Sequence, residues 1–528
     1  MKKQTVAKTS DLEPGKMITV KAGSTPILLA QVNDKIYATG AKCTHNGAVL
    51  AQGALCDRRV VCPWHNASFD VTTGDQLCPP GLDSLPSYPV TVNGDQIEVE
   101  LPDDPHPSRT PAMSSRRLGA DDRVFVILGA GAAGLNAAET LRASGFEGRL
   151  VMITAEAELP YDRTMLSKKY LSGGAGEDAL PLRSREFYQA HDIELKTGSR
   201  VTAVNAVDRQ LTFEGGTTLG YDALLLATGG TAKMPPIDGT DLDRVFKLHN
   251  HQQAEAIVEA AQDAKQAVVV GSSFIGMETA ASLTQQKVAV TVVSPESVPF
   301  EKLLGPEVGR LFQRVHESHG VTFELGGKVT QLHGNGAVEA ATTDSDKRLP
   351  ADLVVIGVGV EPTTGYLQYL QVSPKDKSVP VDEYMRAGEG IYAAGDIATF
   401  PDWRTEEAVR IEHWQLAAQH GRAAARNMME QQVPFRGVPF FWTGQFNLKL
   451  RYVGHVESWD EVIIEGDAES TDSPEFLAFY RKGDRILAVA GINRDKEIAA
   501  ISELMRLDKM PRPDAVRSRV DWMAKLAA

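Results

Sequence analysis

The arrangement of apolar residues changes along the chain, and the first change separates an all-β segment from an α/β segment. The first hundred residues contain short alternating runs such as 35–38, which predict strands with one buried face. From residue 124 onward, uninterrupted apolar runs such as 124–128 and 224–228 end at a glycine turn, which is typical of buried parallel strands. Further runs of this kind occupy residues 150–153, 268–270, 288–293, 353–356 and 391–394.

Two more segments are defined by pattern alone. Residues 104–122 lack periodicity and contain Pro105, Pro107 and Pro111, so we expect a semi-rigid linker. Near the C-terminus, strand-like runs at 476–480 and 485–490 flank a Lys-Gly turn and precede a helical pattern at 498–505. This order predicts a final α+β domain.

The run that begins at Val124 leads directly into Gly129-Ala-Gly131-Ala-Ala-Gly134 and then into a helix. A strand, a glycine-rich turn and a helix place backbone N–H groups at a helix N-terminus, where they can bind a pyrophosphate. Glu156 follows the second strand, in position to accept hydrogen bonds from a ribose. The alternative is a plain tight turn, which a lone glycine triplet would also fit.

The same unit occurs again at Gly271-Ser-Ser273-Phe-Ile-Gly276, followed by a helix and a strand. Two units imply two dinucleotides. Ser273 occupies the place of the second glycine, and Ser294 stands where an NAD-preferring site usually carries glutamate, with Glu296 two residues later. The choice between NADH and NADPH therefore stays open at this stage.

Cys43-x-His45 and Cys62-x-x-His65, separated by sixteen residues, form the most specific motif in the chain. A Rieske [2Fe-2S] centre binds one iron through two cysteine thiolates and the other through two histidine imidazoles. The alternative is a chance pair or half of a zinc site. Because two such pairs occur in the right order, we predict that these four residues are the cluster ligands and that the protein transfers single electrons.

Composition sets further bounds. A chain of 528 residues exceeds the roughly 250 to 300 that one core supports, so we expect three or four domains. The net charge of −14 makes nucleic acid an unfavourable partner, and no run of about 18 apolar residues predicts membrane insertion. Cys56 and Cys78 show no evident disulfide pairing, which favours a reducing, cytoplasmic location. No Cys-x-x-Cys follows the first dinucleotide unit, so disulfide substrates are not expected.

The motifs resemble those of a known family. Residues 1–103 resemble Rieske-type ferredoxins of bacterial oxygenase systems, and the whole chain is similar to the apoptosis-inducing factor-like flavoproteins, which join a Rieske domain to a ferredoxin reductase-type oxidoreductase. The likeness rests on Pro160-Tyr-Asp-Arg163, Leu166-Ser-Lys168, the segment 395–401 and His413-Trp414-Gln415. It implies an all-β Rieske domain, an α/β two-dinucleotide flavoprotein and a C-terminal α+β domain. The implied boundaries are 1–103 for the Rieske domain, 104–122 for the linker, 123–245 and 370–433 for the FAD-binding domain, 246–369 for the NAD(P)-binding domain and 434–528 for the C-terminal domain.

The resemblance also implies the site residues. Lys168 and Glu278 would form a buried pair beside the flavin, with Trp414 bordering the flavin ring, and we assign these three to positioning and electronic roles. Surface charges and a core aromatic are the ordinary alternatives for such residues. The residues implied to bind FAD or NAD(P)H are Gly129, Gly131, Ala132, Ala133, Gly134, Glu156, Arg163, Lys168, Val201, Ala227, Thr228, Gly229, Gly271, Ser273, Phe274, Ile275, Gly276, Glu278, Gly359, Gly395, Asp396, Glu412, His413 and Trp414.

The resemblance predicts an NAD(P)H-dependent oxidoreductase. NAD(P)H would reduce FAD, and electrons would then pass singly to the Rieske cluster and to an external acceptor protein such as an oxygenase component. One alternative is a redox-responsive interaction protein with slow turnover, for which a homodimer is a further expectation. Another is an enzyme whose flavin reduces oxygen or quinones directly. The terminal acceptor is not specified by the sequence.

Overall fold

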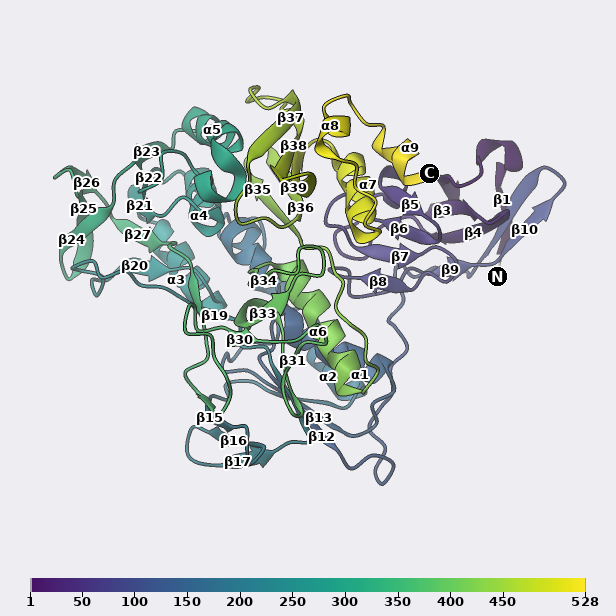
Figure 1. Ribbon diagram of the computed structural model, residues 1–528, viewed down its shortest axis with the longest axis horizontal. Helices are drawn as coiled ribbons and strands as arrows, with labels where there is room; N and C mark the ends of the chain where they lie inside the picture. Colours follow the sequence, from purple (N-terminus) through teal and green to yellow (C-terminus); the bar gives the residue numbers. More distant parts are fainter. Residues whose placement is uncertain (1, 528) are drawn as a thin grey trace.

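A computed structural model describes residues 2–527 of the chain, and its N-terminal part is built from three small antiparallel sheets (Figure 1). The sheets have the orders β1-β11-β10, β2-β3-β4-β9 and β5-β6-β7-β8. Their strands are β1 (Lys2–Lys8), β2 (Met17–Ala22), β3 (Thr25–Val32), β4 (Lys35–Gly40), β5 (Ala54–Cys56), β6 (Arg59–Val61), β7 (Ser68–Asp70), β8 (Gln76–Cys78), β9 (Ser87–Tyr88), β10 (Val90–Asn93) and β11 (Gln96–Leu101). Buried side chains such as Leu28, Leu50 and Phe69 form the core between them.

A six-stranded sheet of order β14-β13-β12-β18-β32-β31 forms the centre of the next part. All its neighbouring strands are parallel except β31 and β32. The strands are β12 (Val124–Leu128), β13 (Arg149–Ile153), β14 (Ile193–Lys196), β18 (Ala223–Leu226), β31 (Arg386–Gly388) and β32 (Ile391–Ala393). As expected from their continuous apolar composition, β12 and β18 are almost wholly buried.

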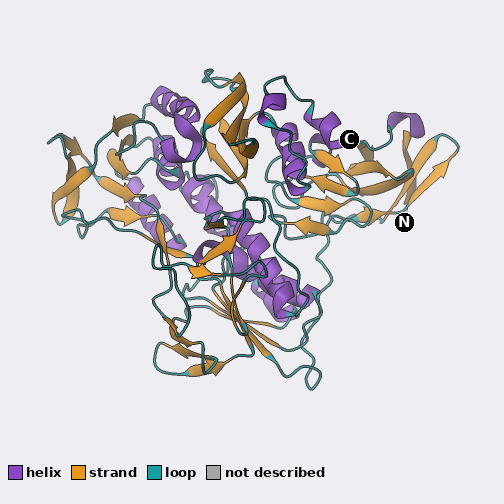
Figure 2. Cartoon of the chain, in the orientation of Figure 1, coloured by secondary structure: helices purple, strands orange, loops and turns teal. Residues whose placement is uncertain are grey.

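Helices α1 (Ala132–Ala143) and α6 (Trp414–Met428) pack together against this sheet, although nearly 300 residues separate them (Figures 1 and 2). Their close approach requires Gly421, because a Cβ there would lie 2.0 Å from the Ala133 carbonyl oxygen. Around them are α2 (Arg185–Ala190), β15 (Val201–Asn205), β16 (Gln210–Phe213), β17 (Thr218–Gly220), β30 (Val379–Pro380), β33 (Ala398–Pro401) and β34 (Ala408–Val409).

A second parallel sheet has the order β20-β27-β21-β22-β23. It lies on the side of the molecule away from the N-terminal sheets (Figure 1). Its strands and helices are β20 (Val245–Lys247), α3 (His251–Ala261), β21 (Gln266–Val270), α4 (Phe274–Gln285), β22 (Ala289–Ser294), α5 (Glu301–Ser318), β23 (Thr322–Leu325) and β27 (Leu353–Ile356). A small sheet of β24 (Val329–Asn335), β25 (Ala337–Thr343) and β26 (Arg348–Pro350) is appended to it.

After the second sheet, the chain returns to the first α/β region, where it forms two short strand pairings. Strand β28 (Val360–Pro362) pairs with β19 (Gly230–Ala232), and β29 (Leu367–Gln368) pairs with β15. These pairings connect the two halves of the first α/β region around the second sheet.

The C-terminal part is a five-stranded antiparallel sheet with helices, as the sequence pattern predicts. Its order is β35-β36-β39-β38-β37. The elements are β35 (Phe440–Gln445), β36 (Leu448–Gly454), β37 (Glu461–Asp467), β38 (Glu475–Lys482), β39 (Arg485–Ile492), α7 (Asp495–Arg506), α8 (Pro513–Val516) and α9 (Trp522–Ala527).

The N-terminal sheets are packed against the C-terminal part rather than separated from it (Figure 1). Ala54, Cys56 and Val61 share one hydrophobic core with Ile501 and Trp522. Asn66 Nδ2 donates to Ser502 Oγ over 2.9 Å across the same contact. Residues 104–122 connect β11 to β12 of the first α/β part, so the contact with the C-terminal part is a second attachment of the N-terminal sheets. No helix within residues 2–527 is long and apolar enough to cross a membrane.

Candidate redox site

The two Cys-x-His and Cys-x-x-His segments form loops that face each other. Backbone bonds close both loops, from Gly47 N to the Cys43 carbonyl over 2.9 Å and from Cys62 N to the Ala67 carbonyl over 2.8 Å. Both cysteines are buried, whereas His45 and His65 are only partly buried. The Nδ1 atoms of the two histidines lie 3.1 Å apart.

This geometry fits the ligand set of a [2Fe-2S] cluster. When two imidazole nitrogens bind the same metal ion, each at about 2 Å, they lie roughly 3 Å from each other, as these two do. Burial lowers the pKa of both His45 and His65, so both rings are held neutral and can act as ligands. Residues 2–527 contain no group of three or more His, Cys, Asp or Glu side chains around one ion position. The site offers two facing histidines and two cysteines of one buried cluster, which are the ligand types of a Rieske centre.

The histidine edge of this site is covered by the C-terminal part of the chain. The Trp442 ring centroid lies 4.5 Å from that of His65 and 6.0 Å from that of His45. Gln415 Nε2 donates to the His65 and Pro79 carbonyls, over 3.3 and 2.8 Å. These contacts hold one ligand loop against α6 and β35.

A cavity of about 700 Å³ runs between the two α/β regions, within the usual range for small-molecule and cofactor sites. The first glycine turn forms part of its wall. Gly129 has a φ of +111°, and a Cβ there would lie 2.1 Å from the Ala227 carbonyl oxygen, whereas a Cβ on Gly131 would meet no atom within 4 Å. The turn therefore leaves a cradle in front of the N-terminus of α1. This is the space that a pyrophosphate would occupy.

Most of the dinucleotide-binding residues expected from the sequence line this one cavity. They are Gly129, Gly131, Ala132, Ala133, Glu156, Arg163, Lys168, Val201, Ala227, Thr228, Gly229, Phe274, Ile275, Glu278, Gly395, Asp396, Glu412, His413 and Trp414. Gly134 does not line it and instead allows tight packing, because a Cβ there would lie 1.9 Å from the Gly129 carbonyl oxygen. The cavity thus fits an extended dinucleotide such as FAD, and Phe274, Ile275 and Glu278 of α4 form part of its wall.

Charged groups in the cavity follow two strands of the first sheet. Glu156 accepts hydrogen bonds from Tyr161 and Arg163 at the end of β13. Asp396 lies at the end of β32, where burial and the nearby Glu412 carboxylate raise the pKa of Asp396 to about 7. A carboxyl with this pKa can both donate to and accept from a ligand hydroxyl near neutral pH.

Lys168 and Glu278 form an ion pair in the middle of the cavity. Lys168 Nζ lies 2.8 Å from Glu278 Oε2, and Glu278 is only 3% exposed. The carboxylate also accepts from Ser167 Oγ over 2.5 Å and from Thr443 Oγ1 over 2.6 Å. Glu278 thus joins three parts of the chain beside the place where flavin and nicotinamide would meet.

The second glycine turn lies at one end of α4, outside the lining of this cavity. A Cβ on Gly276 would lie 2.1 Å from the Gly271 carbonyl oxygen, so this glycine allows tight packing. Ser273 Oγ points to the Gly357 carbonyl at 3.4 Å rather than into the turn. Gly359 follows the neighbouring strand β27 and also lies outside the cavity lining. Ser294 Oγ donates to Glu296 over 2.5 Å at the end of β22.

A smaller cavity of about 330 Å³ lies on the histidine side of Trp442. His45, His65 and Trp64 line it together with basic side chains. Trp442, Lys168 and Thr164 line both this cavity and the dinucleotide cavity. A single layer of side chains therefore separates the two sites.

Several of these residues carry no sequence signal. Tyr366, His249 and Thr363 line the dinucleotide cavity but belong to short loops without a motif. Trp442 is one of six tryptophans, and its apolar segment is equally compatible with core packing or with either redox site. The aromatic residues at 440–442 are the sequence signal for this segment, and they do not distinguish between these positions.

Comparison with known proteins agrees with this geometry in three segments. The Rieske [2Fe-2S] domain family matches residues 2–89, the pyridine nucleotide-disulphide oxidoreductase family matches residues 123–421, and the reductase C-terminal family matches residues 440–527. The second match covers more than half of the chain. The chain belongs to the pyridine nucleotide-disulphide oxidoreductase family.

Individual relatives match either nearly the whole of this oxidoreductase or about three quarters of it. It is 39% identical to Apoptosis-inducing factor 3 of Mus musculus over 511 residues, which cover 95% of this chain and 83% of the relative. It is 32% identical to putidaredoxin reductase of Pseudomonas putida, covering 75% of this chain and 94% of the relative. The crystal structure of the covalent putidaredoxin reductase–putidaredoxin complex matches with a TM-score of 0.71 at 31% identity, over 77% of this chain and 98% of that one.

These matches confirm the resemblance, the fold class and the cofactor set expected from the sequence. The chain is an NAD(P)H-dependent oxidoreductase of the apoptosis-inducing factor-like type, with FAD, a Rieske [2Fe-2S] cluster and a nicotinamide as its redox groups. The role of each individual site residue stays a prediction.

Proposed function

We propose that this oxidoreductase passes electrons from NAD(P)H to its own Rieske cluster across Trp442, and from the cluster to an external acceptor protein. The observation that carries the proposal is the position of Trp442. Its ring lines the dinucleotide cavity on one side and contacts His45 and His65 on the other. Because both redox sites lie in one chain, the second electron-transfer step needs no encounter between two proteins.

When bound, FAD accepts two electrons as a hydride and releases them singly, as a [2Fe-2S] cluster requires. The chain's own residues orient the ligands. Lys168 and Glu278 provide a buried, hydrogen-bonded pair that holds the nicotinamide position and favours negative charge beside the flavin ring. Trp414, at the start of α6, borders the same part of the cavity.

Successive residues of β35 join the two sites. Thr443 bonds Glu278, whereas Trp442 points to the histidines and lies opposite Arg451 in the neighbouring strand. Arg451 in turn donates to the Trp64 carbonyl over 3.3 Å. One short strand therefore contacts both the Glu278 carboxylate and the cluster histidines.

The acceptor we propose is a protein that carries or uses single electrons, such as an oxygenase component. The relatives include reductases of oxygenase systems, for example the biphenyl dioxygenase ferredoxin–NAD(+) reductase of Paraburkholderia xenovorans. The cavity beside the cluster histidines carries two exposed lysines, Lys169 and Lys449, and one partly buried carboxylate, Asp162. This basic lining favours an acceptor with an acidic docking surface.

The proposal predicts that Trp442→Leu slows reduction of the cluster but not reduction of the flavin. The substitution removes the aromatic ring between the two sites and leaves the cluster ligands and the Lys168–Glu278 pair unchanged. In anaerobic single-turnover experiments with NADH, the rate of the cluster absorbance change should fall roughly tenfold or more, about 1.4 kcal/mol in barrier height.

The matched control is Trp459→Leu, which removes a tryptophan that packs on Tyr480 and lines neither redox cavity. It should leave both rates unchanged. Equal rates of cluster reduction in Trp442→Leu and in the unmodified protein would show that electrons do not cross this residue.

A further inference from the structure

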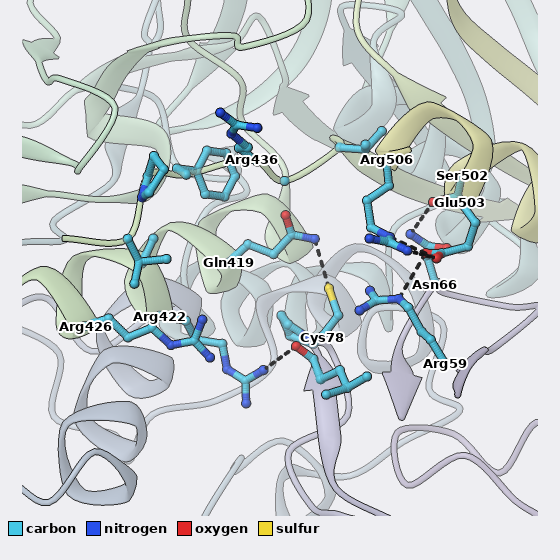
Figure 3. Close-up of a pocket in the computed structure, with 18 residues that line it drawn as sticks. Arg59, Asn66, Cys78, Gln419, Arg422, Arg426, Arg436, Ser502, Glu503 and Arg506 are labelled. Atoms are coloured by element: carbon cyan, nitrogen blue, oxygen red, sulfur yellow. Dashed lines mark hydrogen bonds and ion pairs between the residues drawn. The ribbon is translucent and has the colours of Figure 1, made fainter. Parts of the chain in front are cut away.

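A third cavity, of about 220 Å³, lies where the Rieske domain, α6 and α7 meet, beside the ligand loop that contains Asn66 and outside the two cavities described above (Figure 3). It is smaller than the roughly 300 to 1,000 Å³ of drug-sized ligand sites, which restricts it to a small ligand. Its charged lining consists of Arg59, Arg422, Arg426, Arg436, Arg506 and Glu503. Three separate parts of the chain therefore contribute charge to one small space.

The lining is strongly positive although the protein carries a net charge of −14. Its single carboxylate, Glu503, is 2% exposed and is shared by two guanidinium groups. Arg59 Nε lies 3.0 Å from it, and an Arg506 amino nitrogen lies 2.7 Å from it (Figure 3). One negative charge cannot neutralise both arginines.

In the part of the chain that the structure describes, the other three arginines have no acidic side chain within ion-pair distance. Arg422 donates only to neutral groups, the Leu77 carbonyl at 3.3 Å and the Gln76 side-chain oxygen. Burial lowers the pKa of Arg422, which reflects the cost of holding a guanidinium without a counter-charge. Within residues 2–527, Arg426 and Arg436 form no side-chain hydrogen bond or ion pair.

The cavity also contains two amide oxygens that lack donors. Asn66 is 7% exposed and donates to Ser502, and Gln419 donates to Cys78 Sγ over 3.1 Å (Figure 3). Their oxygens, Asn66 Oδ1 and Gln419 Oε1, are buried without a partner in the described structure. A buried acceptor without a donor is unfavourable, and a ligand hydroxyl or a bound water would satisfy it.

We propose that this cavity binds a small hydroxylated anion with a phosphate or carboxylate group. The unpaired guanidinium groups of Arg422 and Arg426 would bind the anionic group, because their planar donors match the oxygens of phosphates and carboxylates. Asn66 and Gln419 would accept from ligand hydroxyls. A ligand here would connect the Rieske domain to α6 and α7, and would stabilise the docked arrangement by mass action.

The test is anion binding to the flavin-loaded protein in the presence of saturating NAD+, so that both dinucleotide sites are filled. Isothermal titration calorimetry and thermal unfolding would be measured with inorganic phosphate and with citrate, against chloride at equal ionic strength. We expect saturable binding of at least one anion, and a rise in Tm that saturates over the same concentration range.

Arg422→Gln and Arg426→Gln should each weaken this binding by roughly tenfold or more. Arg426 is exposed on α6, so its variant tests the site even if Arg422→Gln fails to fold. Arg348→Gln, at an exposed position in β26, is the matched control and should bind as the unmodified protein does. Binding of phosphate alone or citrate alone would identify the anionic group.

The proposal would be overturned by the absence of binding beyond the chloride control, or by unchanged affinity in both arginine variants. Because the readout is ligand binding, it is independent of the electron path proposed above. A failure here would leave that path untouched, and a failure of the path would leave this site untouched.

Discussion

We expect His65→Ala to abolish NADH-dependent reduction of a one-electron acceptor such as cytochrome c, while NADH continues to reduce the flavin. The substitution removes one of two imidazoles whose Nδ1 atoms lie 3.1 Å apart, so one iron loses half of its protein ligands. The dinucleotide cavity does not include this residue. Acceptor turnover, iron content and the electron paramagnetic resonance signal of the reduced cluster would be measured together.

His333→Ala is the matched control, because His333 lies on β24, bonds Thr342 and is remote from the cluster loops. It should retain both activity and cluster. Acceptor turnover at the unmodified rate in cluster-free His65→Ala would mean that the flavin serves the acceptor directly, which is the alternative of an oxidase or quinone reductase.

The second large effect is expected from Glu278→Ala. Glu278 is buried and accepts from Lys168, Ser167 and Thr443. Its loss leaves the Lys168 ammonium without a counter-charge and removes the anchor between the second dinucleotide unit and β35. We expect flavin reduction by NADH to slow roughly ten- to a hundredfold, or about 1.4 to 2.7 kcal/mol in barrier height, in stopped-flow measurements.

Reduction of the cluster by dithionite should stay intact in Glu278→Ala, because this carboxylate does not contact the cluster loops. Glu278→Gln keeps the shape but not the charge, and so separates electrostatics from packing. Glu317→Ala, at an exposed position on α5, serves as the control. Unchanged hydride-transfer kinetics in Glu278→Ala would remove the proposed role of the ion pair.

Much of this fold follows from local pattern. Continuous apolar runs predict the buried strands β12, β18, β21 and β27, because a parallel strand covered on both faces needs apolar residues throughout. The sequence also predicts where Gly129 and Gly134 are needed, because the tight turn and the packing of the following helix leave no room for a Cβ at these positions. The four cluster ligands are identified by residue type and spacing alone.

The remaining features depend on contacts between distant segments. The sequence leaves Trp442 open between the core, the flavin and the cluster, and only the fold shows that it contacts His45 and His65, almost 400 residues earlier. The arginine-lined cavity is likewise assembled only when β6, α6 and α7 pack together. The sequence pattern does not predict short strand pairings such as that of β29 with β15, because a strand of two residues shows no periodicity. Tertiary packing, rather than local propensity, determines these features.

The central claim is that electrons move from the flavin to the cluster within one chain. The measurement that tests it most directly is the rate of cluster reduction after anaerobic mixing with NADH, recorded over a wide range of protein concentrations. A tethered, docked cluster predicts an observed first-order rate constant that does not depend on protein concentration. An observed rate constant that rises in proportion to protein concentration would show that the cluster is reduced by a second molecule and would contradict the account.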